Sequence, residues 1–120
     1  MLITVDFDHT LQFNDGSPND TTLQMLRMNH KGDQIVIVTS RSFSVGSVKA
    51  IQDFAKQHNL NVSNIIHTNG SLKGPICKAV NSQRHFDDCE ADLDSVKEQG
   101  VDIVNCFDAQ AWSREVILHL

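Results

Sequence analysis

Short apolar runs alternate with longer amphipathic segments along this chain, and this alternation limits the folds open to it more than any single motif does. The clearest run is Ile35–Val38, four consecutive β-branched residues, which is typical of a strand buried on both faces of a sheet. The segment after it places Val48, Ile51 and Phe54 at helical spacing. Strands that alternate with helices in this way indicate a parallel sheet covered by helices.

The pattern predicts strands at residues 2–5, 35–38, 62–67, 101–106 and, as a short polar strand, around 85–86. It predicts helices at residues 20–32, 45–58, 73–80, 91–99 and 109–118. The first helix is expected to end at Gly32, and its apolar positions are Leu23, Met25, Leu26 and Met28. Five strands with helices between them, joined by right-handed crossovers, form a sheet with helices on both faces. We therefore expect an α/β fold, namely a three-layer Rossmann-like sandwich around a five-stranded parallel sheet. We expect it to form a single domain of residues 1–120.

Composition narrows the class of protein. The chain has 120 residues and a net charge of −5, and domains usually contain about 100–150 residues. No apolar run approaches the roughly 18 residues of a membrane span, and the start, Met1–Asp6, lacks the basic region of a signal peptide. Cys77, Cys89 and Cys106 are odd in number and widely spaced, so we expect reduced thiols and a cytoplasmic location.

Polar residues follow several of the expected strands. In open parallel sheets, ligands bind at the carboxyl ends of the strands. Asp6 and Asp8 follow the first strand, Asp87 and Asp88 follow the fourth, and Lys73 opens the helix before the fourth. Thr39 and Arg41 follow the second strand. We therefore expect carboxylates, a hydroxyl group and two cations to meet at one edge of the sheet.

Such a set of groups favours phosphoryl transfer. Clustered carboxylates repel one another unless a cation neutralises them, and an all-oxygen site suits Mg²⁺. An ionised aspartate can attack phosphorus, and a second carboxyl group two residues away can protonate the leaving oxygen. A hydroxyl group and a lysine can hold the phosphoryl oxygens. The residues therefore predict a reaction that passes through an aspartyl-phosphate.

The segment Asp6-Phe7-Asp8-His9-Thr10 resembles the DxDxT signature of the haloacid dehalogenase-like (HAD) phosphohydrolases. Val36–Arg41 is similar to the second motif of that family, Lys73 to the third and Asp87-Asp88 to the fourth. The motifs occur in the family's order and extend over residues 6–92. His9 departs from the family pattern, because glycine or asparagine is more common there.

The resemblance assigns the acidic residues to catalysis and to metal binding. It implies that Asp6 is the nucleophile and that Asp8 is the general acid and base. Both would also bind Mg²⁺, Asp8 through its backbone carbonyl group. Asp88 would hold the metal, with Asp87 as an additional candidate. Asp92 is a further candidate, although an acidic residue in the first turn of a helix is favourable in any case.

The resemblance also assigns residues to the phosphate. Thr39 and the backbone amide of Ser40 would bind the phosphoryl group, and Arg41 is a candidate for contact with the substrate. Thr10 would stabilise the turn after the first strand, within a short flap of residues 9–18. Lys73 would pair with Asp6 and the phosphate.

Other residues have simpler interpretations. Lys78 competes with Lys73 for the third motif, and Lys73 is preferred because it lies nearer the start of its helix, where the resemblance implies that the lysine points inward. The six histidines show no zinc-ligand spacing with the cysteines and are interpreted as surface or core residues. Trp112 is interpreted as an anchor that packs the last helix on the sheet.

Three functions remain open. The first is a Mg²⁺-dependent phosphatase. The second is a nucleotidase or polynucleotide-end phosphatase, because His85-Phe86-Asp87-Asp88 is similar to the phosphatase domains of polynucleotide kinases, although the acidic net charge and the lack of a basic stripe oppose it. The third is a binding or regulatory module that keeps the fold without turnover.

The gaps between the motifs are short. Residues 11–34 and 42–71 cannot house the cap domain that most family members insert, so the resemblance implies a capless form. Water must then be excluded by the flap, by a large phosphorylated substrate such as a macromolecule or nucleotide, or by a homo-oligomer that shields the site.

Overall fold

The computed structural model describes residues 1–107, so the predicted helix at 109–118 and its Trp112 lie outside the described residues. The elements are, in chain order, β1 (Leu2–Val5), α1 (Asp20–Asn29), β2 (Gln34–Thr39), α2 (Val45–Gln57), β3 (Val62–His67), α3 (Gly74–Ala79), β4 (Arg84–Asp87), α4 (Glu90–Glu98) and β5 (Asp102–Asn105). The five strands form one sheet in the order β3-β2-β1-β4-β5, and every pair of neighbouring strands is parallel.

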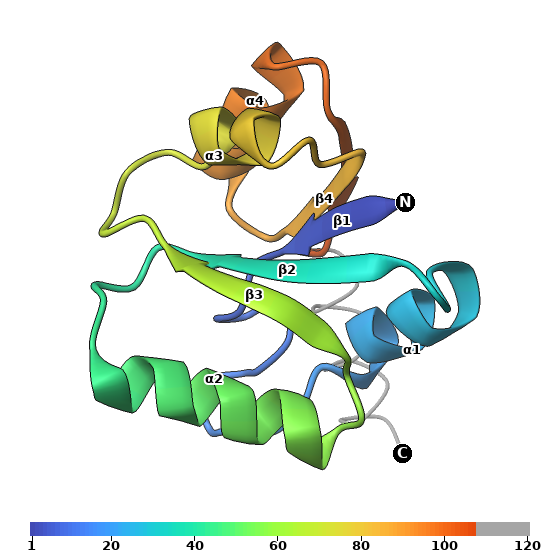
Figure 1. Cartoon of the computed structure of the whole chain (residues 1–120), viewed down its shortest axis with the longest axis vertical. Coiled ribbons are helices and arrows are strands. Elements are labelled where there is room, and N and C mark those ends of the chain that lie inside the picture. Colours follow the sequence, from blue (N-terminus) through green and yellow to red (C-terminus); the bar gives the residue numbers. More distant parts are fainter. Residues whose placement is uncertain (108–120) are drawn as a thin grey trace.

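The helices cover both faces of the sheet. Helices α1 and α2 lie on one face, and α3 and α4 lie on the other (Figure 1). The predicted three-layer α/β sandwich is therefore confirmed. The chain moves outward from β1 to β3 and then returns to place β4 on the other side of β1. Ligands bind beside such a reversal of strand order, and here the reversal lies between the ends of β1 and β4.

The helix boundaries follow from local chemistry. The side chain of Asn19 accepts a hydrogen bond from the Thr22 amide at the start of α1, and Ser44 does the same for α2. Gly100 follows α4 with a φ of +78°, as a residue that ends a helix often does.

The expectation that α1 ends at Gly32 was wrong. The helix ends at Asn29, because His30 caps it and enters a tight turn in which the Asp33 amide donates to the His30 carbonyl group. Gly32 lies in this turn with a φ of +87°. Met28 was also misassigned as an apolar contact position: its side chain is exposed, and the buried face of α1 is formed by Thr22, Leu23 and Leu26.

Strand β4 is better formed than its polar sequence suggests. It pairs with β1 on one side and β5 on the other. Side chains alternate between the two faces of a strand, so Phe86 packs into the main core with Ile3 and Ile37, while His85 and Asp87 face the opposite side. Both polar side chains are fully buried, and their partners explain why the strand tolerates them.

The segments between the strands contain no additional domain. Only a loop and α1 connect β1 to β2, and only α2, β3 and their loops lie between β2 and α3. No inserted cap is therefore present among residues 1–107. Within the same residues, none of the helices has the length and hydropathy that a membrane crossing requires.

Candidate functional site

A buried lysine lies between two carboxylates at the carboxyl edge of the sheet. Lys73 Nζ donates to Asp6 Oδ1 at 2.7 Å and to Asp87 Oδ2 at 2.9 Å. Asp6 directly follows β1, and Asp87 is the last residue of β4. All three side chains are buried. Of the two lysines considered for this position, the structure therefore brings Lys73 to the carboxylates, whereas Lys78 is exposed.

Helix α4 fixes the backbone that carries Lys73. The Lys73 amide donates to Asp92 Oδ1 at 3.2 Å, and the Gly74 amide donates to Ser95 Oγ at 3.0 Å. A Cβ atom on Gly74 would collide with the backbone and hydroxyl group of Ser95, so only glycine allows this approach. Asp92 Oδ2 lies 3.8 Å from Lys73 Nζ. Asp92 therefore anchors the lysine and lies outside the carboxylate group described below.

Both carboxylate oxygens of Asp87 accept two hydrogen bonds each. Oδ1 accepts from the amides of Asp88 and Cys89, at 2.9 and 3.0 Å. Oδ2 accepts from Lys73 Nζ and lies 2.8 Å from His85 Nε2. A carboxylate has about four acceptor positions, so Asp87 has none left for another ligand.

His85 is a buried neighbour of Asp87 whose contact the sequence interpretation did not predict. Its assignment to the surface or to the core is confirmed for the core, because the side chain is fully buried, and its Nε2 lies 2.8 Å from Asp87 Oδ2. The signal was present in the sequence, since residues 85 and 87 share one face of a strand. A histidine two residues before an aspartate predicts a contact only where both residues are known to lie on a strand.

Burial and neighbouring charges shift the pKa values of these groups. Burial raises the pKa of Asp6, the charge of Asp87 raises it further, and Lys73 opposes both. For Asp87, burial acts upward, but His85 and Lys73 outweigh it and lower the pKa to about 2. For Lys73 and His85, burial acts downward, yet their partners outweigh it; the pKa of Lys73 is raised, and that of His85 reaches about 9.

A second carboxylate contact joins the two strand ends through Thr10. Its hydroxyl group lies 3.1 Å from Asp6 Oδ2 and 3.2 Å from Asp88 Oδ1. Thr10 was expected to stabilise the turn after β1 and was counted among the residues of the phosphate site, and in the structure its hydroxyl group contacts both of these acidic side chains.

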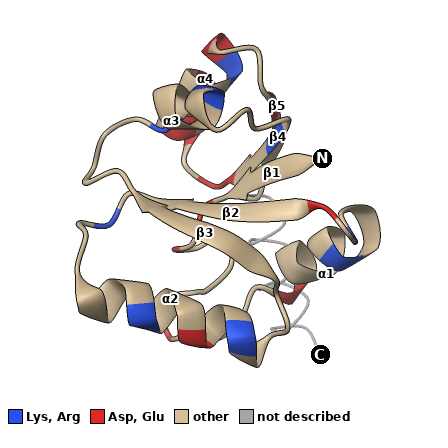
Figure 2. Ribbon diagram, in the orientation of Figure 1, with Lys and Arg blue, Asp and Glu red and all other residues tan. Residues whose placement is uncertain are grey.

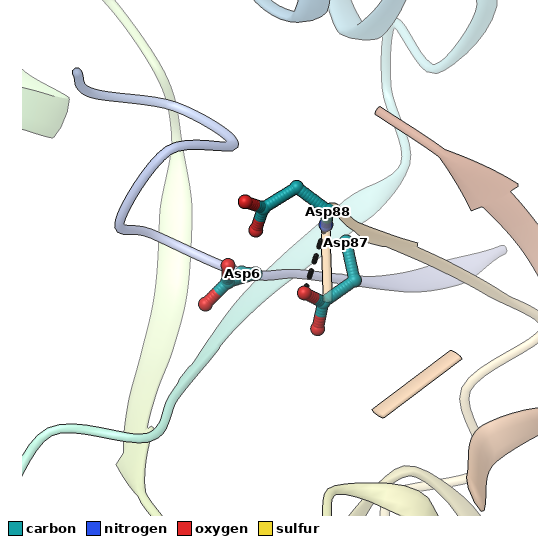
Figure 3. A group of neighbouring side chains, drawn as sticks. All are labelled: Asp6, Asp87 and Asp88. Carbon is teal, nitrogen blue, oxygen red and sulfur yellow. Dashed lines mark hydrogen bonds between the residues drawn. The ribbon is translucent and has the colours of Figure 1, made fainter. Parts of the chain in front are cut away.

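Three carboxylates could hold a metal ion. Asp6, Asp87 and Asp88 each offer an oxygen, and these oxygens lie within 4.8 Å of one another. The side chains of Asp87 and Asp88 leave the end of β4 in different directions (Figure 3). Because Asp87 is already saturated by hydrogen bonds, Asp6 and Asp88 are the carboxylates with free acceptor positions. Oxygen donors of this kind fit Mg²⁺.

Asp8 lies in a separate ion pair. Arg41 Nε and Nη2 donate to Asp8 Oδ2 and Oδ1, at 2.8 and 2.7 Å, which is the two-pronged geometry that guanidinium and carboxylate groups favour. The Arg41 guanidinium also lies 5.1 Å from the centre of the Phe7 ring. The hydrogen bond to Asp8 raises the pKa of Arg41. The Asp8 carboxylate is thus not in the group formed by Asp6, Asp87 and Asp88.

The end of β2 is held by backbone contacts. Thr39 is buried, and its hydroxyl oxygen accepts from the Arg41 amide at 3.2 Å. Ser40 is exposed, and its carbonyl oxygen accepts from the Gly70 amide at 2.9 Å. These contacts fix the loop that carries the predicted phosphate-binding residues, at the same edge of the sheet as Asp6.

The predicted flap is a short folded loop. The Leu11 amide donates to the Phe7 carbonyl group at 2.9 Å, and the Phe13 amide donates to that of Ser17 at 2.9 Å. His9 adopts a φ of +66°, which few residues other than glycine adopt readily. This explains why glycine or asparagine is the more usual residue at this position of the motif.

Basic residues are dispersed over the described part of the chain (Figure 2). On α2, Lys49 and Lys56 lie on either side of Asp53 along the helix. None of the helices within residues 1–107 therefore presents the continuous basic face that non-specific binding to nucleic acid requires.

Comparisons with known proteins place this geometry in context. The model of the family described as haloacid dehalogenase-like hydrolase matches residues 3–116. A chain from the "Structure of the Pnkp1/Rnl/Hen1 RNA repair complex" is similar in fold, with a TM-score of 0.62 and 15% sequence identity over 87% of this chain. The present chain spans 42% of that chain's length. A comparison with curated proteins gives no match.

Proposed function

Because this chain belongs to the haloacid dehalogenase-like hydrolase family, we propose that it is a Mg²⁺-dependent phosphatase that acts through an aspartyl-phosphate on Asp6. The observation that carries the proposal is the buried contact of Lys73 with Asp6. This contact leaves the second oxygen of Asp6 to Thr10, beside Asp88. A lysine in this position acts against the rise in the pKa of Asp6 that burial causes, and it supplies positive charge where the phosphoryl group would lie.

In the first step, an Asp6 oxygen attacks phosphorus, the bond from phosphorus to the ester oxygen breaks, and Asp8 donates a proton to that oxygen. In the second step, Asp8 accepts a proton from water while the water oxygen attacks phosphorus and the bond to Asp6 breaks. Thr39 and the Ser40 amide are proposed to bind the phosphoryl oxygens.

Asp8 cannot act while it is fully paired with Arg41. Both of its oxygens accept from the guanidinium in the structure. We therefore propose that Arg41 turns toward the substrate when it binds, which frees Asp8 for proton transfer. The partial exposure of both side chains, 32% for Arg41 and 40% for Asp8, leaves room for this exchange.

The carboxylates of Asp6 and Asp88 are proposed to hold a Mg²⁺ ion, because both have free acceptor positions and lie close together, and the backbone carbonyl group of Asp8 is proposed as a further ligand. Once bound, the ion would neutralise negative charge on the transferring phosphoryl group. Asp87, which was a candidate ligand, is proposed instead to hold Lys73, because its acceptor positions are already filled.

The test is release of phosphate from p-nitrophenyl phosphate with and without Mg²⁺. We expect turnover that EDTA abolishes and that added Mg²⁺ restores. The variant Asp6→Asn keeps the shape of the side chain and should lose this activity. Metal-dependent turnover no higher than that of Asp6→Asn, over a broad panel of phosphate esters, would refute the proposal. Mg²⁺ binding without turnover would then favour a non-catalytic binding module.

A polynucleotide-end phosphatase is a narrower second candidate. The observation that favours it is the similarity in fold to a chain of an RNA repair complex. An open site without an inserted cap also suits a large substrate, or a homo-oligomer whose second copy shields the site. A comparison of oligonucleotides that carry a 3′- or 5′-phosphate with the matching mononucleotides would decide between the general and the narrow activity.

A further inference from the structure

A chain of polar side chains runs behind the candidate site, on the face of the sheet that α3 covers. It begins at Asp87, whose Oδ2 lies 2.8 Å from His85 Nε2. On the other side of the ring, His85 Nδ1 lies 2.7 Å from Thr4 Oγ1, which in turn lies 2.8 Å from Ser82 Oγ. The Ser82 hydroxyl group donates to the Arg84 carbonyl group at 3.0 Å. Both ring nitrogens of His85 therefore have partners, and the chain ends on the backbone.

These residues are buried at a place where apolar side chains would be less costly. Thr4 and His85 are neighbours in the register of β1 and β4, and both are fully buried. Burial of polar groups is unfavourable unless each finds a partner, and apolar residues of similar volume often stabilise a core more. The stability of the fold therefore does not explain why these buried residues are polar.

The position of Asp87 supplies that reason. Its Oδ1 is fixed by two backbone amides, whereas its Oδ2 meets only side chains, those of Lys73 and His85. Lys73 is long and flexible, and it reaches Asp6 from α3 across the edge of the sheet. Rotation of the Asp87 carboxylate would change the point at which the lysine charge is held. The two backbone amides restrict this rotation at Oδ1, and the ring of His85, which has fewer rotatable bonds than Lys73, restricts it at Oδ2.

We propose that His85 is a positioning residue of the hydrolase site, which fixes the Asp87 carboxylate and, through it, holds the Lys73 ammonium group against Asp6. This inference rests on the proposed phosphatase function for its kinetic consequence, but its structural part concerns the Lys73 group alone. His85 does not contact the reacting atoms. It acts through Asp87, and the hydrogen bond from Nε2 is the part of the ring that matters.

Two amide substitutions separate this role from a merely structural one. In His85→Gln, the amide nitrogen can occupy the place of Nε2 and still donate to Asp87. In His85→Asn, the amide nitrogen lies near the place of Nδ1, so it can reach Thr4 but not Asp87. We expect kcat for p-nitrophenyl phosphate to fall about 10–100-fold in His85→Asn, a range typical for the loss of a supporting contact. We expect His85→Gln to stay within about threefold of the wild type, by the same reasoning.

A matched control is available on the opposite face. His30 is also buried and also contacts an aspartate, with Nδ1 2.9 Å from Asp33 Oδ2, but it lies at the far end of the sheet from the site. Because His30 contacts Asp33 through Nδ1, His30→Gln is the change that removes this contact, and it should leave kcat unchanged. If His85→Asn does not fold, His85→Phe removes the same donor and takes its place in the comparison.

A second measurement does not depend on turnover. The side-chain ammonium ¹⁵N resonance of a buried, hydrogen-bonded lysine can be followed by NMR, and Lys73→Met identifies it. We expect this resonance to be kept in His85→Gln and shifted or broadened in His85→Asn. If the wild type has no phosphatase activity, the proposed function fails, and this resonance alone decides the role of His85. Equal kcat values in the two His85 variants, or an unmoved resonance in His85→Asn, would overturn the inference.

Discussion

Two sets of ion pairs lie at the same edge of the sheet, and they differ in how far their side chains are buried. Lys73 is buried with Asp6 and Asp87, and its exposed fraction is 1%. Arg41 and Asp8 form a pair of similar length, but about a third of each side chain faces solvent. The distances are therefore similar, but the Lys73 contacts are closed to water, whereas water can replace either partner of the Arg41–Asp8 pair.

The difference in burial sets what each pair can do. A buried pair cannot lose one member without leaving an uncompensated charge in a medium of low dielectric. An exposed pair contributes little to stability, because water and salt replace either partner. We therefore expect the Lys73 group to set the geometry of the site, and the Arg41–Asp8 pair to open when substrate binds.

The largest effect is expected for Lys73→Met. This change leaves Asp6 and Asp87 without their shared cation, so the free energy of unfolding should fall by about 3–5 kcal/mol. Turnover should fall by about 10²–10³-fold, since a preorganised cation is lost from the site. Urea unfolding and the phosphatase assay measure the two quantities.

The control for this change is Lys78→Met, on the exposed face of the same helix. It should alter the free energy of unfolding by less than about 0.5 kcal/mol. Similar losses of unfolding free energy in Lys73→Met and Lys78→Met would contradict the proposed importance of the buried contacts of Lys73.

The next effect separates activity from stability. Asp8→Asn removes the proposed acid and base, so kcat should fall by about 10²–10⁴-fold. The free energy of unfolding should change by less than about 1 kcal/mol, because the pair with Arg41 is partly exposed. Asp102→Asn breaks another exposed pair, with Arg84, and should leave kcat unchanged. A large loss of stability in Asp8→Asn would contradict the distinction between the two pairs.

A smaller effect is expected for Arg41→Ala. If Arg41 turns to the substrate, its loss should raise KM about tenfold, since one hydrogen bond between charged groups contributes about 1.5 kcal/mol. Arg41→Lys should restore only part of the affinity, because an ammonium group cannot make the two-pronged contact. The difference between these variants should shrink at high salt. An unchanged KM in Arg41→Ala would place the residue outside the substrate site.

The smallest effect is expected for Lys49→Ala, which removes the exposed pair with Asp53 on α2. The free energy of unfolding should change by less than about 0.5 kcal/mol and turnover not at all. The same unfolding and activity assays measure both quantities, and the changes in the other variants are compared with those in this one.

The fold and the positions of the acidic residues could be predicted because they depend on short-range patterns. The β-branched run at 35–38 and the apolar residues before Asp6 predict strands, and the parallel sheet then brings their ends together. Lys73 could be preferred over Lys78 from its place at the start of a helix.

The side-chain pairings could not be predicted, because they depend on contacts across the sheet. His85 lies opposite Thr4, 81 residues away, and Arg41 reaches Asp8 across 33 residues. The local sequence around His85 carries no sign of its contact with Thr4, whereas its contact with Asp87 follows once the strand is known. For Asp87, the Lys73 donor comes from another element, whereas the amides of Asp88 and Cys89 and the ring of His85 lie within two residues of it in the chain.

The close approach of Gly74 to Ser95 has a consequence for how this chain can vary. At this point the Gly74 backbone lies against the backbone and the hydroxyl group of Ser95, and the backbone atoms of Ser95 cannot move aside as the end of a flexible side chain could. A single methyl group at residue 74 would move the start of α3, and with it the lysine that precedes it. We therefore expect the site to tolerate substitution poorly at Gly74, although this residue has no side chain that could take part in the reaction.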